Sequence, residues 1–183
     1  MDIEFWYGNP SIEVHKGNLK LCEKLAGKFC VIDIPTSLIL PDLCNFFFTF
    51  LPEIEEFKIF KTSSNKMYCC AISLNHIETS AFFIEQFADK RFNSIEEHQC
   101  SIVNIEGWDC ETSELFSKFH DKCLICLEEL DRPAVSILCG HLFHIKCLEM
   151  WSDATCPVCR YHQTTPDMSE CDTCGVRLIF GCV

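Results

Sequence analysis

Short apolar runs alternate with polar or turn-forming breaks along the first 105 residues of this 183-residue chain. Two alternating stretches flank the turn cluster Gly8-Asn9-Pro10-Ser11, which predicts a hairpin or extended entry within residues 1–28. The later runs predict strands at 29–34, 54–61, 66–74 and 100–105, and helices at 40–50 and 78–89. Residues 107–121 are mixed and polar, which is typical of a connector.

The order of these elements from Phe29 onward is β-α-β-β-α-β. Pro41 and Asp42 suit the first turn of the first helix, and the apolar stripe of the second helix recurs at helical spacing. We therefore expect an α+β protein whose residues 1–115 form a ferredoxin-like domain, the shape also adopted by RRM domains.

An RRM shape raises the possibility of RNA binding, which depends on exposed aromatic side chains of the two central strands. The predicted strand 29–34 offers no aromatic residue in its central part, and the strand 66–74 offers only Tyr68. The formal charge is −12, with 10 basic against 18 acidic residues before Asp121 and 5 against 9 from there on. A net negative charge on the protein disfavours binding to the phosphate backbone of nucleic acids and favours binding to a basic protein. We therefore expect no nucleic-acid partner. A buried structural position is the simpler interpretation of Tyr68.

Eight metal-capable side chains follow in one interleaved pattern within residues 120–163. Pairs at this spacing bind two zinc ions, and the order of three Cys, two His and three Cys is that of the RING-H2 finger. In RING fingers the pairs cross-brace, so that the first and third pairs share one zinc and the second and fourth share the other. The predicted ligands are Cys123, Cys126, Cys139, His141, His144, Cys147, Cys156 and Cys159.

Two other interpretations of the cysteines are less favourable. A disulfide framework is typical of short secreted chains, whereas the opening MDIEFWYGNP lacks the features of a signal peptide and no segment predicts a membrane span. A hydrolytic zinc would need an open coordination position, whereas both predicted sites have four protein ligands. We therefore expect two structural zinc ions, and small apolar roles for the seven scattered cysteines before the cluster.

Further residues around the ligands match positions that RING ubiquitin ligases use. Ile125, Trp151 and Pro157 match the apolar surface that binds a ubiquitin-conjugating enzyme. Arg160 matches the linchpin cation that hydrogen-bonds both that enzyme and its thioester-linked ubiquitin. The alternatives are that Trp151 packs into the core and that Arg160 is an ordinary exposed side chain.

The whole pattern resembles the BRAP family of RING ubiquitin ligases. The resemblance is carried by FWYGNPSIEVHKGNLKL, by KRFNSIEEHQCSIVNIE and by CLICLEELD…CGHLFHIKCLEMWSDATCPVCRYHQTTPD…CDTCGV. It implies a cytoplasmic ubiquitin ligase whose partners are a charged ubiquitin-conjugating enzyme and a protein substrate. The acidic charge would suit a substrate with basic segments. The alternative from another class is a non-catalytic scaffold that uses the zinc unit for protein contacts only.

Residues 164–183 resemble the opening of the UBP-type zinc finger that follows the RING in this family. Only Cys171, Cys174 and Cys182 are present, and the sequence ends before the remaining ligands and the family's coiled coil. Either the gene is reduced or the sequence is truncated, and in both cases we expect no ubiquitin binding by this tail. A third zinc held by these three thiols and His162 is the less favoured alternative to a metal-free tail. Nothing in the sequence identifies the substrate, the conjugating enzyme, the chain linkage or the oligomeric state.

Overall fold

The computed structural model describes residues 2–62, 67–110, 122–130, 134–151 and 155–162. Within them, no helix is long and apolar enough to cross a membrane. The strands are β1 (Asp2–Asn9), β2 (Glu13–Leu21), β3 (Lys28–Pro35), β4 (Ile54–Lys61), β5 (Met67–Leu74), β6 (Ser101–Cys110), β7 (Ala134–Ser136) and β8 (Leu142–His144). The α-helices are α1 (Leu40–Phe46), α2 (Ser80–Phe87) and α4 (Ile145–Glu149), and the 3-10 helices are η1 (Phe48–Glu53) and η2 (Ile77–Thr79).

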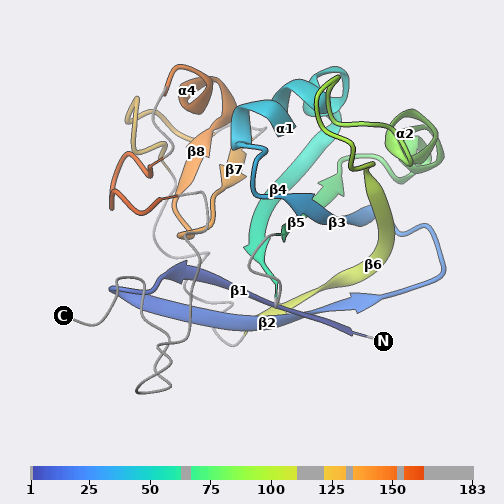
Figure 1. Cartoon of the computed structure of the whole chain (residues 1–183), viewed down its shortest axis with the longest axis horizontal. Coiled ribbons are helices and arrows are strands. Elements are labelled where there is room, and N and C mark those ends of the chain that lie inside the picture. Colours follow the sequence, from blue (N-terminus) through green and yellow to red (C-terminus); the bar gives the residue numbers. More distant parts are fainter. Residues whose placement is uncertain (1, 63–66, 111–121, 131–133, 152–154, 163–183) are drawn as a thin grey trace.

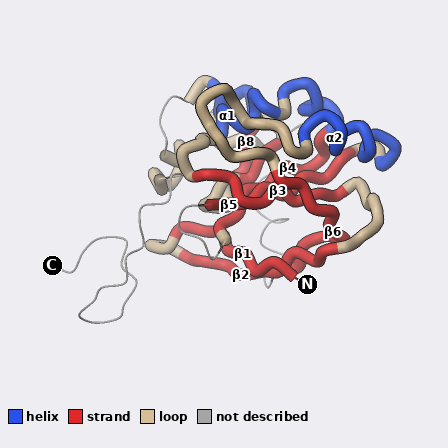
Figure 2. The backbone as a smooth tube through the Cα atoms, turned by 45° about the vertical axis from the view of Figure 1, so that its right-hand side comes forward, coloured by secondary structure: helices blue, strands red, loops and turns tan. Residues whose placement is uncertain are grey.

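The strands form one eight-stranded sheet in the order β1-β2-β6-β3-β5-β4-β7-β8. The sheet curls until β1 also meets β4, where Trp6 is paired with Lys61. Figure 1 shows α1 and α2 above the central strands and the β1–β2 hairpin below them, and Figure 2 shows the same arrangement from another side. The strands β7 and β8 continue the sheet beyond β4, so the metal-binding segment is built onto the N-terminal part.

The α+β class and the strands and helices expected from the pattern are found, but the sheet is larger than the predicted four strands. The prediction that a connector begins at Gly107 is wrong, because β6 continues to Cys110. This extension pairs with β2, where Gly17 lies opposite Cys110. A Cβ atom at Gly17 would lie 2.4 Å from the Asp109 carbonyl oxygen, so glycine is needed for the two strands to approach.

Separate hydrophobic clusters fill the two faces of the central strands. The cluster on the helix side includes Phe29, Phe47, Phe57 and Phe83 and continues into β7, β8 and α4. The cluster on the opposite side packs the hairpin onto the central strands, and its buried members are Phe5, Tyr7, Leu19, Cys30, Phe60, Cys69, Ala71 and Ile105. The face of the central strands opposite the helices is therefore covered by the chain's own hairpin.

Tyr68 lies on the helix side, is buried, and donates its hydroxyl proton to the Leu38 carbonyl at 3.0 Å. It therefore has the buried structural role that the sequence favoured. The thiols of Cys44 and Cys100 are also buried, and burial raises the pKa of each to about 12. Both thiols are protonated at neutral pH and act as small apolar side chains, as expected.

Replacement of Phe47 by alanine should destabilise the fold by about 3–5 kcal/mol, because it leaves a cavity among closely packed rings. Phe47 is fully buried, and its ring contacts those of Phe46, Phe57, Phe83 and Phe87. Its neighbour Phe48 is 66% exposed and is the matched control. Denaturant unfolding should therefore show a large loss for Phe47→Ala and a change within about 0.5 kcal/mol for Phe48→Ala. Equal losses would contradict this assignment of the core.

Candidate metal centre

Two short loops with the same hydrogen-bond pattern present four of the eight predicted ligands. In the first zinc loop, residues 123–128, the Leu127 N–H donates to the Cys123 carbonyl and the Cys123 N–H donates to the Glu128 carbonyl, both at 2.8 Å. The second zinc loop, residues 156–161, repeats this: the Arg160 N–H donates to the Cys156 carbonyl at 2.9 Å and the Cys156 N–H to the Tyr161 carbonyl at 2.8 Å. Each turn aims two cysteine side chains the same way.

The fifth residue of each loop has a left-handed backbone, with φ of 64° at Leu127 and 59° at Arg160. This conformation costs a non-glycine residue roughly 1–2 kcal/mol. The two loops therefore hold Leu127 and Arg160 in equivalent positions despite the cost.

The fold brings the eight residues into two groups of four. The first cluster comprises Cys123, Cys126, His144 and Cys147, and the second comprises Cys139, His141, Cys156 and Cys159. Within each cluster the ligand atoms all lie within 4.8 Å of one another. The first and third pairs along the chain thus share one site, and the second and fourth share the other, which is the cross-braced arrangement.

In the first cluster the imidazole of His144 is oriented by its own backbone contact. His144 Nε2–H donates to the Glu129 carbonyl at 2.9 Å, and this contact turns Nδ1 toward the cysteines. His144 Nδ1 lies 3.3 Å from Cys126 Sγ and 3.8 Å from Cys147 Sγ. The tautomer that this hydrogen bond selects is the one that ligates through Nδ1.

In the second cluster His141 Nδ1 lies 3.2 Å from Cys139 Sγ and 3.6 Å from Cys156 Sγ. The Cys139 thiol hydrogen-bonds Cys156, which lowers the pKa of Cys156 to about 4 and raises the pKa of Cys139. Backbone N–H groups of Val158 and Cys159 also donate to Cys156 Sγ, at 3.4 and 3.5 Å. Cys139 and Cys156 share one proton through this hydrogen bond. A metal cation bound between the two sulfur atoms could replace that proton.

Both clusters fit zinc. Tetrahedral zinc with its usual Zn–S and Zn–N lengths requires S···N edges of about 3.6 Å, and the four S···N distances span 3.2–3.8 Å. Each cluster supplies three thiolates and one imidazole, a closed donor set without a position for substrate or water. The protein therefore binds two structural zinc ions through these residues. Cys171, Cys174 and Cys182 lie outside the described residues.

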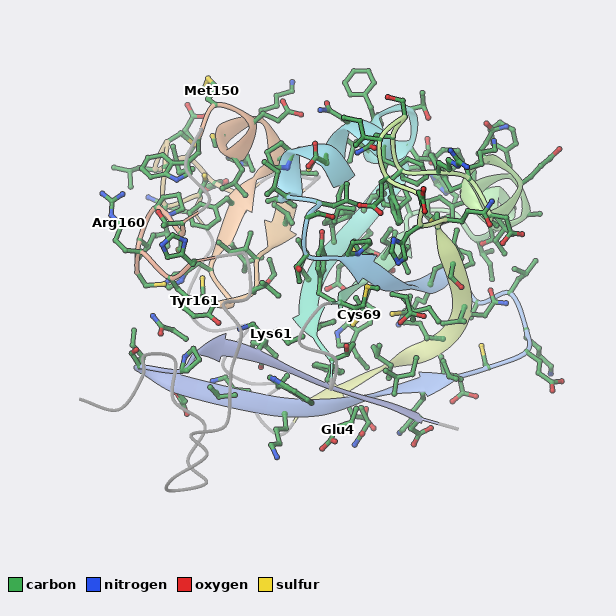
Figure 3. The ribbon with its side chains drawn as sticks, in the orientation of Figure 1. Glu4, Lys61, Cys69, Met150, Arg160 and Tyr161 are labelled. Carbon is green, nitrogen blue, oxygen red and sulfur yellow. The ribbon has the colours of Figure 1, made fainter. Side chains whose placement is uncertain are left out.

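Side chains predicted to contact a conjugating enzyme lie around the two loops. Trp151 follows Met150, the residue that caps the end of α4, and its indole N–H donates to the Thr155 carbonyl at 3.0 Å. The Arg160 guanidinium carbon lies 5.5 Å from the centre of the Trp151 ring, so these two predicted residues are brought together. Ile125 is in the first zinc loop and Pro157 is in the second, and both are half-buried. Arg160 and Met150 are labelled on this outer edge of the molecule in Figure 3.

Sequence reasoning missed a contact between the metal-binding segment and β4. The buried Lys61 ammonium donates to the hydroxyl of Tyr161, the last residue of the second zinc loop. Tyr161 lies in the stretch CRYHQT, which is part of the resemblance described above. Nothing local in the sequence distinguishes Lys61 from other strand lysines.

The interleaved clusters, with β7, β8 and α4 between them, define a RING finger protein. A Ring finger domain model matches residues 121–160, and the model described as "BRCA1-associated protein 2" matches residues 23–118. The chain belongs to the BRCA1-associated protein 2 family.

The chain is also similar to several curated proteins. The mouse protein named "BRCA1-associated protein" is 33% identical over 96% of this chain and 34% of its own length. The Arabidopsis thaliana "BRAP2 RING ZnF UBP domain-containing protein 2" is 30% identical over 79% of this chain and 33% of its own length. The Arabidopsis "E3 ubiquitin-protein ligase AIRP1" is 40% identical over 28% of this chain. The chain thus spans about a third of its family relatives' length, and no solved structure matches it.

Proposed function

We propose that this chain is a RING-type ubiquitin ligase, which binds a charged ubiquitin-conjugating enzyme and promotes transfer of ubiquitin to substrate lysines. The observation that carries the proposal is the Arg160 guanidinium carbon, in the second zinc loop, lying 5.5 Å from the Trp151 ring centre beside two clusters that fit zinc. The name of the Arabidopsis "E3 ubiquitin-protein ligase AIRP1", to which this chain is 40% identical over 55 residues, supports the same activity.

The surface around this pair suits an apolar partner. From residue 122 onward, the large hydrophobic side chains that the described residues expose are Leu127, Met150 and Val158. Leu127 lies in the first zinc loop, Val158 in the second, and Met150 at the end of α4 beside Trp151. Exposed apolar side chains next to an aromatic anchor are typical of a protein-binding surface. Ile125 and Pro157 would complete it.

In this mechanism the chain supplies no nucleophile. Zinc holds the two loops in shape, and Arg160 donates its planar fork of N–H groups to the conjugating enzyme and to its ubiquitin together. Fixing the thioester in an attack-ready arrangement accelerates attack by a substrate lysine through proximity and orientation.

We infer further that residues 1–115 are an RRM-like interaction domain and residues 120–163 the RING unit. The adjacent strands β6-β3-β5-β4 and the two helices on one face support the ferredoxin-like interpretation of the first part. The formal charge of −12 suits substrates with basic segments. Reduced thiolates are required at both clusters, so we propose that the protein acts in the cytoplasm.

A panel of ubiquitin-conjugating enzymes, each assayed with the full chain and ubiquitin, tests the proposal. We expect ubiquitin conjugates with at least one enzyme, and at least a tenfold weaker binding of that enzyme by Trp151→Ala, because truncating an aromatic anchor costs about 2 kcal/mol or more. The control is Trp108→Ala on β6, whose ring lies against Lys58 rather than in the RING segment. Inactivity with every enzyme, despite two bound zinc ions, would favour the non-catalytic scaffold.

A further inference from the structure

Several contacts join the RING segment to one edge of the N-terminal sheet. The strand β7 pairs in parallel with β4, and the Gly8 N–H donates to the Leu138 carbonyl at 2.8 Å, next to the second cluster. The Lys61 ammonium reaches the Tyr161 hydroxyl, and Figure 3 shows these two side chains at the junction. Of these contacts, the one between Lys61 and Tyr161 leads directly to the loop that carries Arg160.

Lys61 is an unusual residue for this position. Its relative exposure is 7%, and no carboxylate of the described residues lies within 4 Å of its ammonium. Burial lowers the pKa of Lys61 to about 8, so the charged form still predominates at pH 7. Burying an ammonium is costly, and an apolar side chain of similar size would serve packing at least as well. A role beyond packing is therefore the better explanation for this lysine.

The route from Lys61 to Arg160 is short and consists of defined contacts. Tyr161 is fixed at its side chain by Lys61 and at its carbonyl by the Cys156 N–H, at 2.8 Å. Arg160, immediately before it, has a φ of 59° and donates its N–H to the Cys156 carbonyl at 2.9 Å. The direction of the Arg160 side chain over Trp151 depends on this turn remaining closed. Fixing Tyr161 from β4 limits how far that turn can rotate.

We propose that Lys61 of the N-terminal domain is a positioning residue for ubiquitin transfer: by holding Tyr161 it keeps Arg160 stacked on Trp151 and aimed at the charged conjugating enzyme. The inference rests on the ligase function proposed above. It makes the N-terminal domain part of the catalytic apparatus, in addition to any role in binding substrate. A RING segment cut away from β4 would keep its zinc ligands and lose this support.

Lys61→Met in the full, zinc-loaded chain tests the proposal, because methionine has a similar length and no charge or donor. We expect kcat at saturating charged enzyme to fall about tenfold, which is less than the roughly 10²-fold that a 1 Å misplacement can cost. KM for the charged enzyme and the two bound zinc ions should be unchanged. Tyr161→Phe removes only the hydroxyl that Lys61 contacts and should lower kcat in the same way. This variant tests the same contact if Lys61→Met folds poorly.

Two comparisons separate positioning from general damage. Lys20→Met removes a surface lysine that pairs with Asp109 and should leave kcat unchanged. In an Arg160→Ala background, Lys61→Met should have no further effect on kcat, because Lys61 acts through Arg160. Independent, multiplicative losses of kcat, or a loss confined to KM, would overturn the proposal.

A readout that needs no ligase activity keeps the inference separate from the proposed function. The Nε–Hε signal of Arg160 should be shifted by the Trp151 ring current in the wild type and should lose that shift in Lys61→Met. An unchanged signal in the variant would overturn the positioning role. The wild type could fail to transfer ubiquitin while the Arg160 signal still changes in Lys61→Met. That result would refute the ligase proposal but would support the role of Lys61 in positioning Arg160.

Discussion

Replacement of Cys123 by alanine should remove one zinc ion and unfold the RING segment. Cys123 is a fully buried member of the first cluster, and structural zinc contributes an apparent 10–16 kcal/mol per site. That is comparable with the about 5–15 kcal/mol of net stability of a typical whole domain, so we expect the segment to unfold without it. Metal analysis should find at most one zinc per chain, and ubiquitin transfer should disappear.

The loss should extend beyond the RING segment, because its core is continuous with that of the N-terminal part. Val135, Phe143 and Leu148 belong to the same hydrophobic cluster as Phe57. We therefore expect a lower unfolding temperature for the N-terminal sheet as well, measured by near-UV circular dichroism. Cys22→Ala is the control, since Cys22 is half-exposed and outside both clusters. Two bound zinc ions in Cys123→Ala would refute the ligand assignment.

Arg160→Ala should lower ubiquitin transfer by about 10²-fold while both zinc ions and the fold are retained. This is the scale of losing one preorganised donor to a transition state. Arg160 is exposed and is not a ligand, so its truncation should change the unfolding free energy by less than about 1 kcal/mol even though its contact with Trp151 is lost. The measurement is the single-turnover rate of thioester discharge, taken beside a metal analysis and an unfolding curve.

Arg160→Lys adds information on why arginine is needed. Lysine keeps the charge but lacks the planar fork that can bridge two proteins, so it should restore only a small part of the rate. Arg91→Ala, an exposed arginine of the N-terminal part, should leave the rate unchanged. Full activity of Arg160→Ala would mean that the cation is not the linchpin.

Local patterns predicted much of this molecule well, for identifiable physical reasons. The strand expected at 54–61 is β4 with the same bounds, because its apolar positions are set by burial on both faces of the sheet. The eight predicted ligand residues gather into two clusters that could each hold a metal ion, and their spacing could be recognised because zinc loops need cysteine or histidine pairs at fixed spacing. The helix expected at 40–50 ends at Phe46 and continues as a 3-10 helix, in which Pro52 cannot donate a backbone hydrogen bond.

Contacts between segments distant in the sequence could not be predicted in the same way. The closure of the sheet at Trp6 and Lys61, and the parallel pairing of β4 with β7, depend on how the chain packs in three dimensions. The sequence does not distinguish Lys61 from other lysines in predicted strands. Its contact with Tyr161 is created by the three-dimensional fold. The resemblance to a known family predicted the N-terminal part and the RING segment. The contacts that join these two parts could be identified only from the structure.

The zinc-bound chain should activate a charged ubiquitin-conjugating enzyme. This can be measured as the rate at which a preformed enzyme–ubiquitin thioester discharges to free lysine, with and without the full chain loaded with two zinc ions. We expect the wild type to accelerate discharge markedly and Arg160→Ala to remove the acceleration without loss of zinc. Discharge at the uncatalysed rate, with every conjugating enzyme and with both zinc ions bound, would contradict it.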